Sequence, residues 1–187
     1  MTDVSNAIFD GSSAIMLSDE TSIGNYPVES LRYMKNITLE TEKNMNLTEL
    51  SCSLKELGKI DISKPENYAK IINYSSCITA NLLNAAGILC ITKNEKCAIA
   101  LSNNRTKAPI FAVTTSEQIA KQLSLVWNVH PILIEGINDT NQLIQKSIEK
   151  LKVLNYLKEG DSIVINGDTV EDKDSEIASL VSSVMKI

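Results

Sequence analysis

Histidine is almost absent from this chain, since His130 is the only one among 187 residues. A metal centre built from several histidines is therefore excluded. A serine–histidine catalytic pair could use no histidine other than His130. An excess of basic residues is lacking as well, because the formal net charge is −5 at pH 7. Such a balance argues against a surface that follows nucleic-acid phosphates.

Long apolar runs are also missing, and none approaches the roughly 20 residues that cross a bilayer. The amino terminus, MTDVSNAIFDG, has neither the basic stretch nor the apolar core of a signal peptide. Zinc spacings and a dense disulfide framework are absent, so we interpret the cysteines as thiols in a reducing cytosol. These cysteines are Cys52, Cys77, Cys90 and Cys97. We expect a cytoplasmic protein without membrane or nucleic-acid partners.

The most informative segment is 10–29, which reads DGSSAIMLSDETSIGNYPVE. Its apolar residues 13–17 predict a short strand, and a polar cluster follows at 18–21. Pro27 suits the first position of a helix, which we expect to run to about Asn44. The segment is therefore a strand–loop–helix unit with polar groups at the carboxyl end of its strand, where barrels and doubly wound sheets place their chemistry.

One strand cannot make a barrel, because both of its edges would stay unpaired. Residues 1–47 must therefore add to something absent from the chain or pack irregularly. Met1 falls just before a helix, which suggests a truncated product, a split gene or an incomplete gene model. Residues 48–65 are a polar connector with Gly58 and Pro65, and we place the domain boundary there.

From residue 66 onward, helices and short apolar strands alternate, which predicts a mostly parallel sheet covered on both faces. We expect strands over 87–92, 109–114, 129–134 and 162–166, and helices over 65–86, 96–103, 116–125 and 138–157. The last segment, 175–187, is ambiguous. Its apolar spacing favours a helix, whereas its valine and serine content and short length also fit an edge strand.

The segment 10–29 resembles the last βα unit of the pyruvate kinase barrel, whose usual form is D-G-x-D-x-x-M-L-S-G-E-T-x-x-G-x-Y-P-x-E. The preceding residues 2–7, TDVSNA, are similar to that family's T-D-V-A-N-A. The match is long and ordered, so it is far more specific than a short motif. Asp19 departs from this form, because the family has glycine there.

The second half resembles the C-terminal domain of the same family in four collinear segments. They are 91–98 (ITKNEKCA), 105–114 (RTKAPIFAVT), 120–131 (AKQLSLVWNVHP) and 160–167 (GDSIVING). The resemblance implies a three-layer α/β domain with a mostly parallel, about five-stranded sheet over 66–187, preceded by the last strand–helix unit of an incomplete TIM barrel. It also argues that 175–187 holds a strand.

By resemblance, the intact enzyme transfers phosphate from phosphoenolpyruvate to ADP in glycolysis, with Mg²⁺ and K⁺, as a homotetramer. Ser18 would relay a proton to the enolate of pyruvate, and Glu20 would anchor the loop. The family's lysine, arginine and metal-binding motifs come from earlier barrel strands and match nothing here. We therefore expect this chain alone to be catalytically inactive.

The resemblance also implies an effector-phosphate site at the turn that holds Thr92, Lys93 and Asn94, for a sugar phosphate or a nucleotide. Glu95 stands at the family's glycine, Cys97 replaces a hydroxyl, and loop 167–174 is acidic. These charges oppose a phosphate, so a solvated turn with a residual helix cap is the interpretation we favour. The alternative function is a stand-alone regulatory or oligomerisation module that binds a phosphorylated metabolite.

Overall fold

The computed structural model describes residues 2–45, 60–61, 63–64, 67–92, 94–137, 139–168 and 180–187. The chain forms two compact units, Met1–Asn46 and Leu47–Ile187. The expected connector over 48–65 lies mostly outside the described residues. Among the helices of the described ranges, none is long and apolar enough to cross a membrane.

The first unit holds three helices, α1 (Thr2–Phe9), α2 (Asp19–Ser22) and α3 (Pro27–Asn44). Pro27 begins α3, as its fixed φ and missing N–H predict. Helix α1 packs on α3 through the buried side chain of Ile8, and the hydroxyl of Thr41 donates a hydrogen bond to Ser5 Oγ at 3.0 Å. The predicted helix to about Asn44 is confirmed.

The strand predicted over 13–17 is wrong for this structure, because that segment has no regular secondary structure. A strand is held by hydrogen bonds to a neighbouring strand. The described part of the first unit contains only helices beside this segment, so its backbone has no strand to pair with. Met16 is accordingly 86% exposed.

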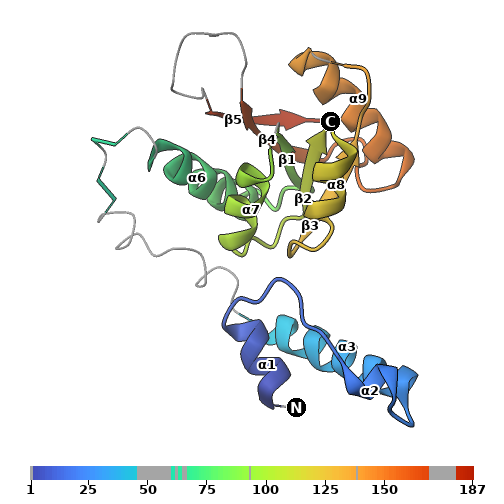
Figure 1. Cartoon of the computed structure of the whole chain (residues 1–187). Coiled ribbons are helices and arrows are strands. Elements are labelled where there is room, and N and C mark those ends of the chain that lie inside the picture. Colours follow the sequence, from blue (N-terminus) through green and yellow to red (C-terminus); the bar gives the residue numbers. More distant parts are fainter. Residues whose placement is uncertain are drawn as a thin grey trace. The chain divides into compact units, whose positions relative to one another are not determined.

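The second unit is built on a five-stranded sheet with the order β3-β2-β1-β4-β5 (Figure 1). Its strands are β1 (Gly87–Ile91), β2 (Ile110–Thr114), β3 (Val129–Leu133), β4 (Ser162–Asp168) and β5 (Leu180–Lys186). The first four run parallel, and β5 is antiparallel to β4. The ambiguous terminal segment is thus a strand over 180–186. Its apolar spacing alone could not show this, because the strand depends on pairing with the edge of β4.

Among the described residues, the sheet is covered by helices α6 (Tyr68–Leu82), α7 (Lys96–Asn103), α8 (Glu117–Leu123) and α9 (Thr140–Val153). The Ser116 hydroxyl caps α8 by accepting from Ile119 N–H at 3.4 Å, and Asp139 caps α9 by accepting from Gln142 N–H at 2.8 Å. Helix α9 ends four residues earlier than predicted. Asn155 there takes a left-handed φ of 61°, which turns the chain out of the helix.

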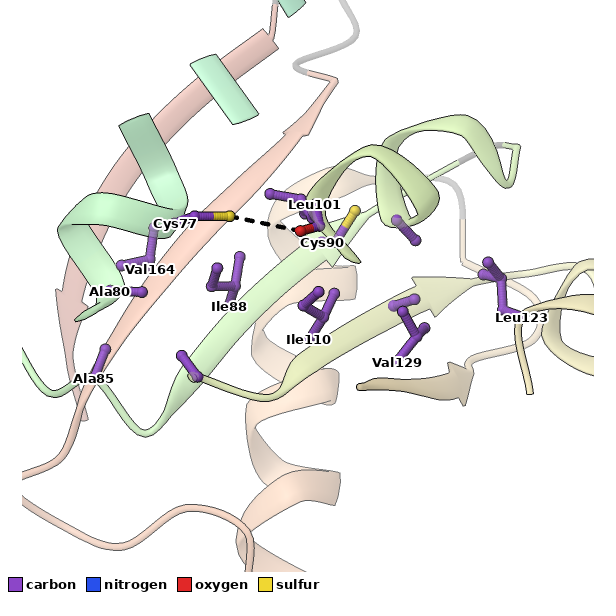
Figure 2. Packing of buried hydrophobic residues seen from close by; sticks show 13 residues of the cluster. Cys77, Ala80, Ala85, Ile88, Cys90, Leu101, Ile110, Leu123, Val129 and Val164 are labelled. Atoms are coloured by element: carbon purple, nitrogen blue, oxygen red, sulfur yellow. Dashed lines mark hydrogen bonds between the residues drawn. The ribbon is translucent and has the colours of Figure 1, made fainter. Parts of the chain in front are cut away.

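The sheet separates two apolar cores, which makes the unit three-layered. Ile88 and Cys90 face the first core, with α6, α7 and α8 (Figure 2). Leu89 and Ile91 face the second core, with α9. Every residue of β1 is buried, as expected for a central parallel strand covered on both faces. The predicted three-layer α/β architecture is therefore confirmed.

His130 is half-buried in a cluster of three rings. Its ring centroid lies 5.8 Å from that of Phe111 and 5.6 Å from that of Tyr156. Phe111 and Tyr156 meet edge to face at 5.3 Å. Burial lowers the pKa of His130 below its usual value. The only histidine is thus a packed residue that the fold holds in its neutral form.

We expect the second unit to lose stability as the pH falls below the unfolded histidine pKa of about 6.5. The unfolded chain then gains a proton that folded His130 binds only at lower pH, so the imidazole's contribution is present at neutral pH and is lost on acidification. The measurement is the thermal midpoint followed by Trp127 fluorescence at neutral and mildly acidic pH. The His130→Gln variant should show a smaller fall, and an equal fall would contradict the assignment.

Candidate functional site

Ser18 and Glu20 lie together in one tight turn at the start of α2. The backbone N–H of Ser18 donates to Glu20 Oε2 at 3.1 Å. The Ser18 carbonyl accepts from the Thr21 hydroxyl at 3.0 Å and from the Thr21 and Ser22 N–H groups at 3.1 Å. The Ser18 side chain is exposed and does not cap α2. Glu20 therefore fixes the backbone that carries an exposed hydroxyl.

The carboxylate of Glu20 is held in its charged form by this turn. Its pKa is lowered, first because it accepts from its own backbone N–H and then because it accepts from Ser18 N–H. Asp19 takes up a helical position as the first residue of α2 and is not among the described residues with positive φ. The aspartate that replaces the family's glycine therefore needs no backbone conformation that only glycine adopts easily.

Gly24 closes the same turn. Its N–H donates to the Asp19 carbonyl at 2.8 Å. A Cβ atom at position 24 would lie 2.5 Å from the Glu20 carbonyl oxygen, a distance that only backbone movement could relieve. Glycine is therefore needed for the chain to pass this close to Glu20 before α3 begins.

The second candidate site lies at the carboxyl ends of β1 and β4. The chain moves from β1 through β2 to β3 and then returns to the other side of β1 with β4. Open α/β sheets bind ligands where the strand order reverses in this way. The two strands are close here, since a Cβ at Gly167 would lie 2.8 Å from Ile91 Cβ. The turn after β1 is thus placed where ligand sites occur.

The polar atoms of that turn bond mainly to one another. The Thr92 hydroxyl donates to the Asn94 carbonyl and accepts from Asn94 N–H, and Thr92 is buried. Asn94 Oδ1 accepts from Lys96 N–H at 2.9 Å, at the start of α7. Lys93, the third predicted phosphate ligand, lies outside the described residues. The structure therefore brings Thr92 and Asn94 together, but each already serves the turn.

Comparison of this sequence with known proteins shows the family to which the chain belongs. The family model for the pyruvate kinase α/β domain matches residues 70–178, and that for the pyruvate kinase barrel domain matches residues 1–31. The chain belongs to the pyruvate kinase family. It is 36% identical over 164 residues to the pyruvate kinase of Clostridium acetobutylicum, covering 88% of this chain and 33% of the relative. It is 34% identical over 171 residues to pyruvate kinase 2 of Synechocystis, covering 91% and 27%.

The chain thus spans about a third of the length of the pyruvate kinases that it matches. The barrel match ends within α3, and the α/β match begins in α6. Both candidate turns therefore lie in matched regions.

A metal site is not built by the described part of this pyruvate kinase chain. No group of three or more histidine, cysteine or acidic side chains there could hold an ion.

A buried polar network beside the second turn was not predicted from the sequence. Asn166 Nδ2 donates to Asn73 Oδ1 at 3.0 Å and to Ser76 Oγ at 2.8 Å. The Ser76 hydroxyl in turn lies 2.9 Å from Ser182 Oγ. The sulfur of Cys97 reaches Asn73 Oδ1 at 3.7 Å and Asn166 Oδ1 at 3.6 Å. The one sequence signal was an asparagine that follows the apolar run 163–165 inside a strand.

Proposed function

We propose that this chain is the carboxyl-terminal part of a pyruvate kinase that converts phosphoenolpyruvate and ADP to pyruvate and ATP in the cytoplasm. Residues 1–47 supply the last strand–helix unit of the barrel, and 66–187 supply the C-terminal α/β domain. The observation that carries this is the collinear match of both family models to one chain. The family's ligands for Mg²⁺ and K⁺, and the lysine and arginine that clamp the phosphate, come from earlier barrel strands. Nothing in these 187 residues matches those strands.

The surface of the first unit supports this proposal. Large apolar side chains are exposed along 16–39, and they are Met16, Ile23, Tyr26, Val28, Leu31, Tyr33 and Leu39. Seven large exposed apolar side chains within 24 residues exceed the single scattered ones that are normal on a protein surface, and this favours a contact with another protein surface. We propose that the missing barrel strands cover these residues and pair with segment 13–17, which then becomes the predicted strand.

In the completed barrel, Ser18 and Glu20 have different roles. A serine hydroxyl can accept a proton from one side and donate its own to the other, so it passes a proton without carrying charge. We assign this relay to Ser18, toward the enolate of pyruvate. Glu20 positions it, since its carboxylate holds the Ser18 backbone N–H at 3.1 Å.

The test is a chimera. The barrel strands that precede the matched region in the pyruvate kinase of Clostridium acetobutylicum are fused to the amino terminus of this chain. We expect the chimera to produce pyruvate from phosphoenolpyruvate and ADP with Mg²⁺ and K⁺, and the 187-residue chain alone to produce none. Turnover by the lone, purified chain would contradict the proposal, as would a folded chimera without activity.

Replacing Ser18 by alanine in the active chimera should lower kcat by about 10²-fold or more, the usual contribution of a positioned proton donor or acceptor. The matched control is Ser13→Ala, which removes another exposed hydroxyl from the same segment. Steady-state kinetics with phosphoenolpyruvate check the effect. Equal activities of the two variants would remove Ser18 from the mechanism.

We propose that the effector-phosphate site at the carboxyl ends of β1 and β4, where the strand order reverses and ligand binding would otherwise be expected, has been lost from this chain. The half-buried Glu95 is the N-cap residue that precedes α7, where an anion would otherwise be favoured. At an effective dielectric constant of about 20, a carboxylate about 4 Å from a phosphate opposes binding by about 4 kcal/mol. We expect calorimetry with fructose bisphosphate, ribose phosphate and AMP to detect no binding to the wild type. Glu95→Gly should bind one of them, because it removes the opposing carboxylate, and tight binding by the wild type would contradict us.

A further inference from the structure

Two thiols meet across the turn between β1 and α7. Cys90 Sγ lies 3.3 Å from Cys97 Sγ. Cys90 is on the central strand and has no exposed surface, whereas Cys97 is in the first turn of α7 and is partly exposed. Figure 2 shows the sulfur of Cys90 beside Leu101 on the helix-covered face of the sheet. Cys97 is thus the partly exposed residue of the pair, and Cys90 is the fully buried one.

The third described thiol is different. Cys77, on α6, is fully buried and donates to the Leu101 carbonyl at 3.7 Å (Figure 2). Burial first, and then the charge of Cys97, raises the pKa of Cys77 to about 12. Since the thiolate is the reactive form, Cys77 is inert. Reaction is thereby confined, among the described cysteines, to the Cys90–Cys97 pair.

We propose that Cys90 and Cys97 form a reversible redox site that a hydroperoxide oxidises to a disulfide. The inference does not depend on the proposed enzymatic function. Cys97 is the residue that reacts first, because it is partly exposed whereas Cys90 is fully buried. Cys90 is the resolving thiol, already 3.3 Å away and shielded from the oxidant.

Oxidation of the cysteine pair takes place in two steps. With hydrogen peroxide, the thiolate of Cys97 attacks one peroxide oxygen, the O–O bond breaks, and Cys97 becomes a sulfenic acid while hydroxide leaves and takes up the thiol proton as water. The sulfur of Cys90 then attacks the sulfur of Cys97, and the S–O bond breaks with loss of a second water. The two thiols lose two electrons and two protons in total, and one hydroperoxide is reduced.

The geometry permits the second step with a small movement. A disulfide needs the sulfurs about 2.05 Å apart, so the 3.3 Å separation must close by roughly 1.2 Å. Cys97 would move away from the amide oxygens of Asn73 and Asn166, which it now contacts at 3.7 Å and 3.6 Å. Oxidation therefore links β1 covalently to α7 and moves Cys97 away from the network that joins α7 to α6 and β4.

The experiment treats the full 187-residue chain, with Cys52→Ser to remove the cysteine outside the described residues, with equimolar hydrogen peroxide. Unreacted thiols are then alkylated and the chain is digested with trypsin without reduction. Lys93 and Lys96 lie between the two cysteines, so the disulfide joins two peptides, 71–93 and 97–105. We expect this linked species, lighter than the two peptides by two hydrogen atoms, and its complete loss with dithiothreitol.

Because peptide 71–93 also carries Cys77, the matched control is Cys77→Ala. We expect the link to persist there and to vanish in Cys97→Ser. Phenylarsine oxide, which bridges paired thiols, should bind the untreated chain in one equivalent and lose this binding in Cys97→Ser. The proposal is overturned if the folded chain carries Cys97 only as sulfenic or sulfinic acid, or if the link disappears in Cys77→Ala.

Discussion

Replacement of Phe111 by alanine should lower the free energy of unfolding of the second unit by about 3–5 kcal/mol. The ring is fully buried in the centre of β2 and packs against Tyr156 and His130. Its loss leaves a cavity between the sheet and α9. Domains of this size have about 5–15 kcal/mol of stability, so the loss is a large fraction of the total. Urea unfolding followed by the fluorescence of Trp127, the only tryptophan, reports on this unit.

A double-mutant cycle with Gly87 tests whether the ring itself causes the effect. A Cβ at position 87 would lie 2.4 Å from an edge carbon of the Phe111 ring. Gly87→Ala should therefore destabilise the wild type by about 1–3 kcal/mol through overpacking. In the Phe111→Ala background most of that cost should vanish, because the cavity accepts the methyl group. Equal costs in both backgrounds would contradict this account of the contact.

Most of the second unit could be predicted from its sequence because local and tertiary signals agree there. Helix α7 was predicted over 96–103 and has those bounds, since its apolar residues face the sheet and left-handed Arg105 follows it closely. Segments 13–17 and 180–186 show the limit of this reasoning. Each is short and apolar, and the presence of a pairing strand decides its structure. Strand β4 is present for the second, and nothing equivalent is described for the first.

The candidate sites were predictable in their position but not in their contacts. The motif placed Ser18 and Glu20 in one turn, but the hydrogen bond from Ser18 N–H to the Glu20 carboxylate needed coordinates. Cys90 and Cys97 have a spacing that fits no known motif, because one ends a strand and the other begins a helix. Their approach is set by how α7 packs back on β1, which is tertiary information.

The buried network around Asn166 gives the second large effect. Asn166 is fully buried on β4 and donates to Asn73 and Ser76, both of α6. Replacing Asn166 by leucine, which has a similar size, removes both donors and leaves polar atoms of Asn73 and Ser76 with fewer partners. Each buried polar group that is left unsatisfied costs about 1–3 kcal/mol, so we expect a loss of about 2–4 kcal/mol in urea unfolding. The matched control is Ser182→Ala, at the exposed end of the same network, which should cost less than about 1 kcal/mol.

The combined Asn73→Leu, Asn166→Leu variant separates a satisfied network from simple packing. Removing both partners leaves no orphaned amide between α6 and β4, so the double loss should be smaller than the sum of the single losses by about 0.5–3 kcal/mol. If the two losses simply add, the side chains act independently and the hydrogen bond at 3.0 Å does not couple the helix to the sheet. If coupling is found, the contacts of Cys97 with these same two amide oxygens predict that oxidation of the cysteine pair weakens it.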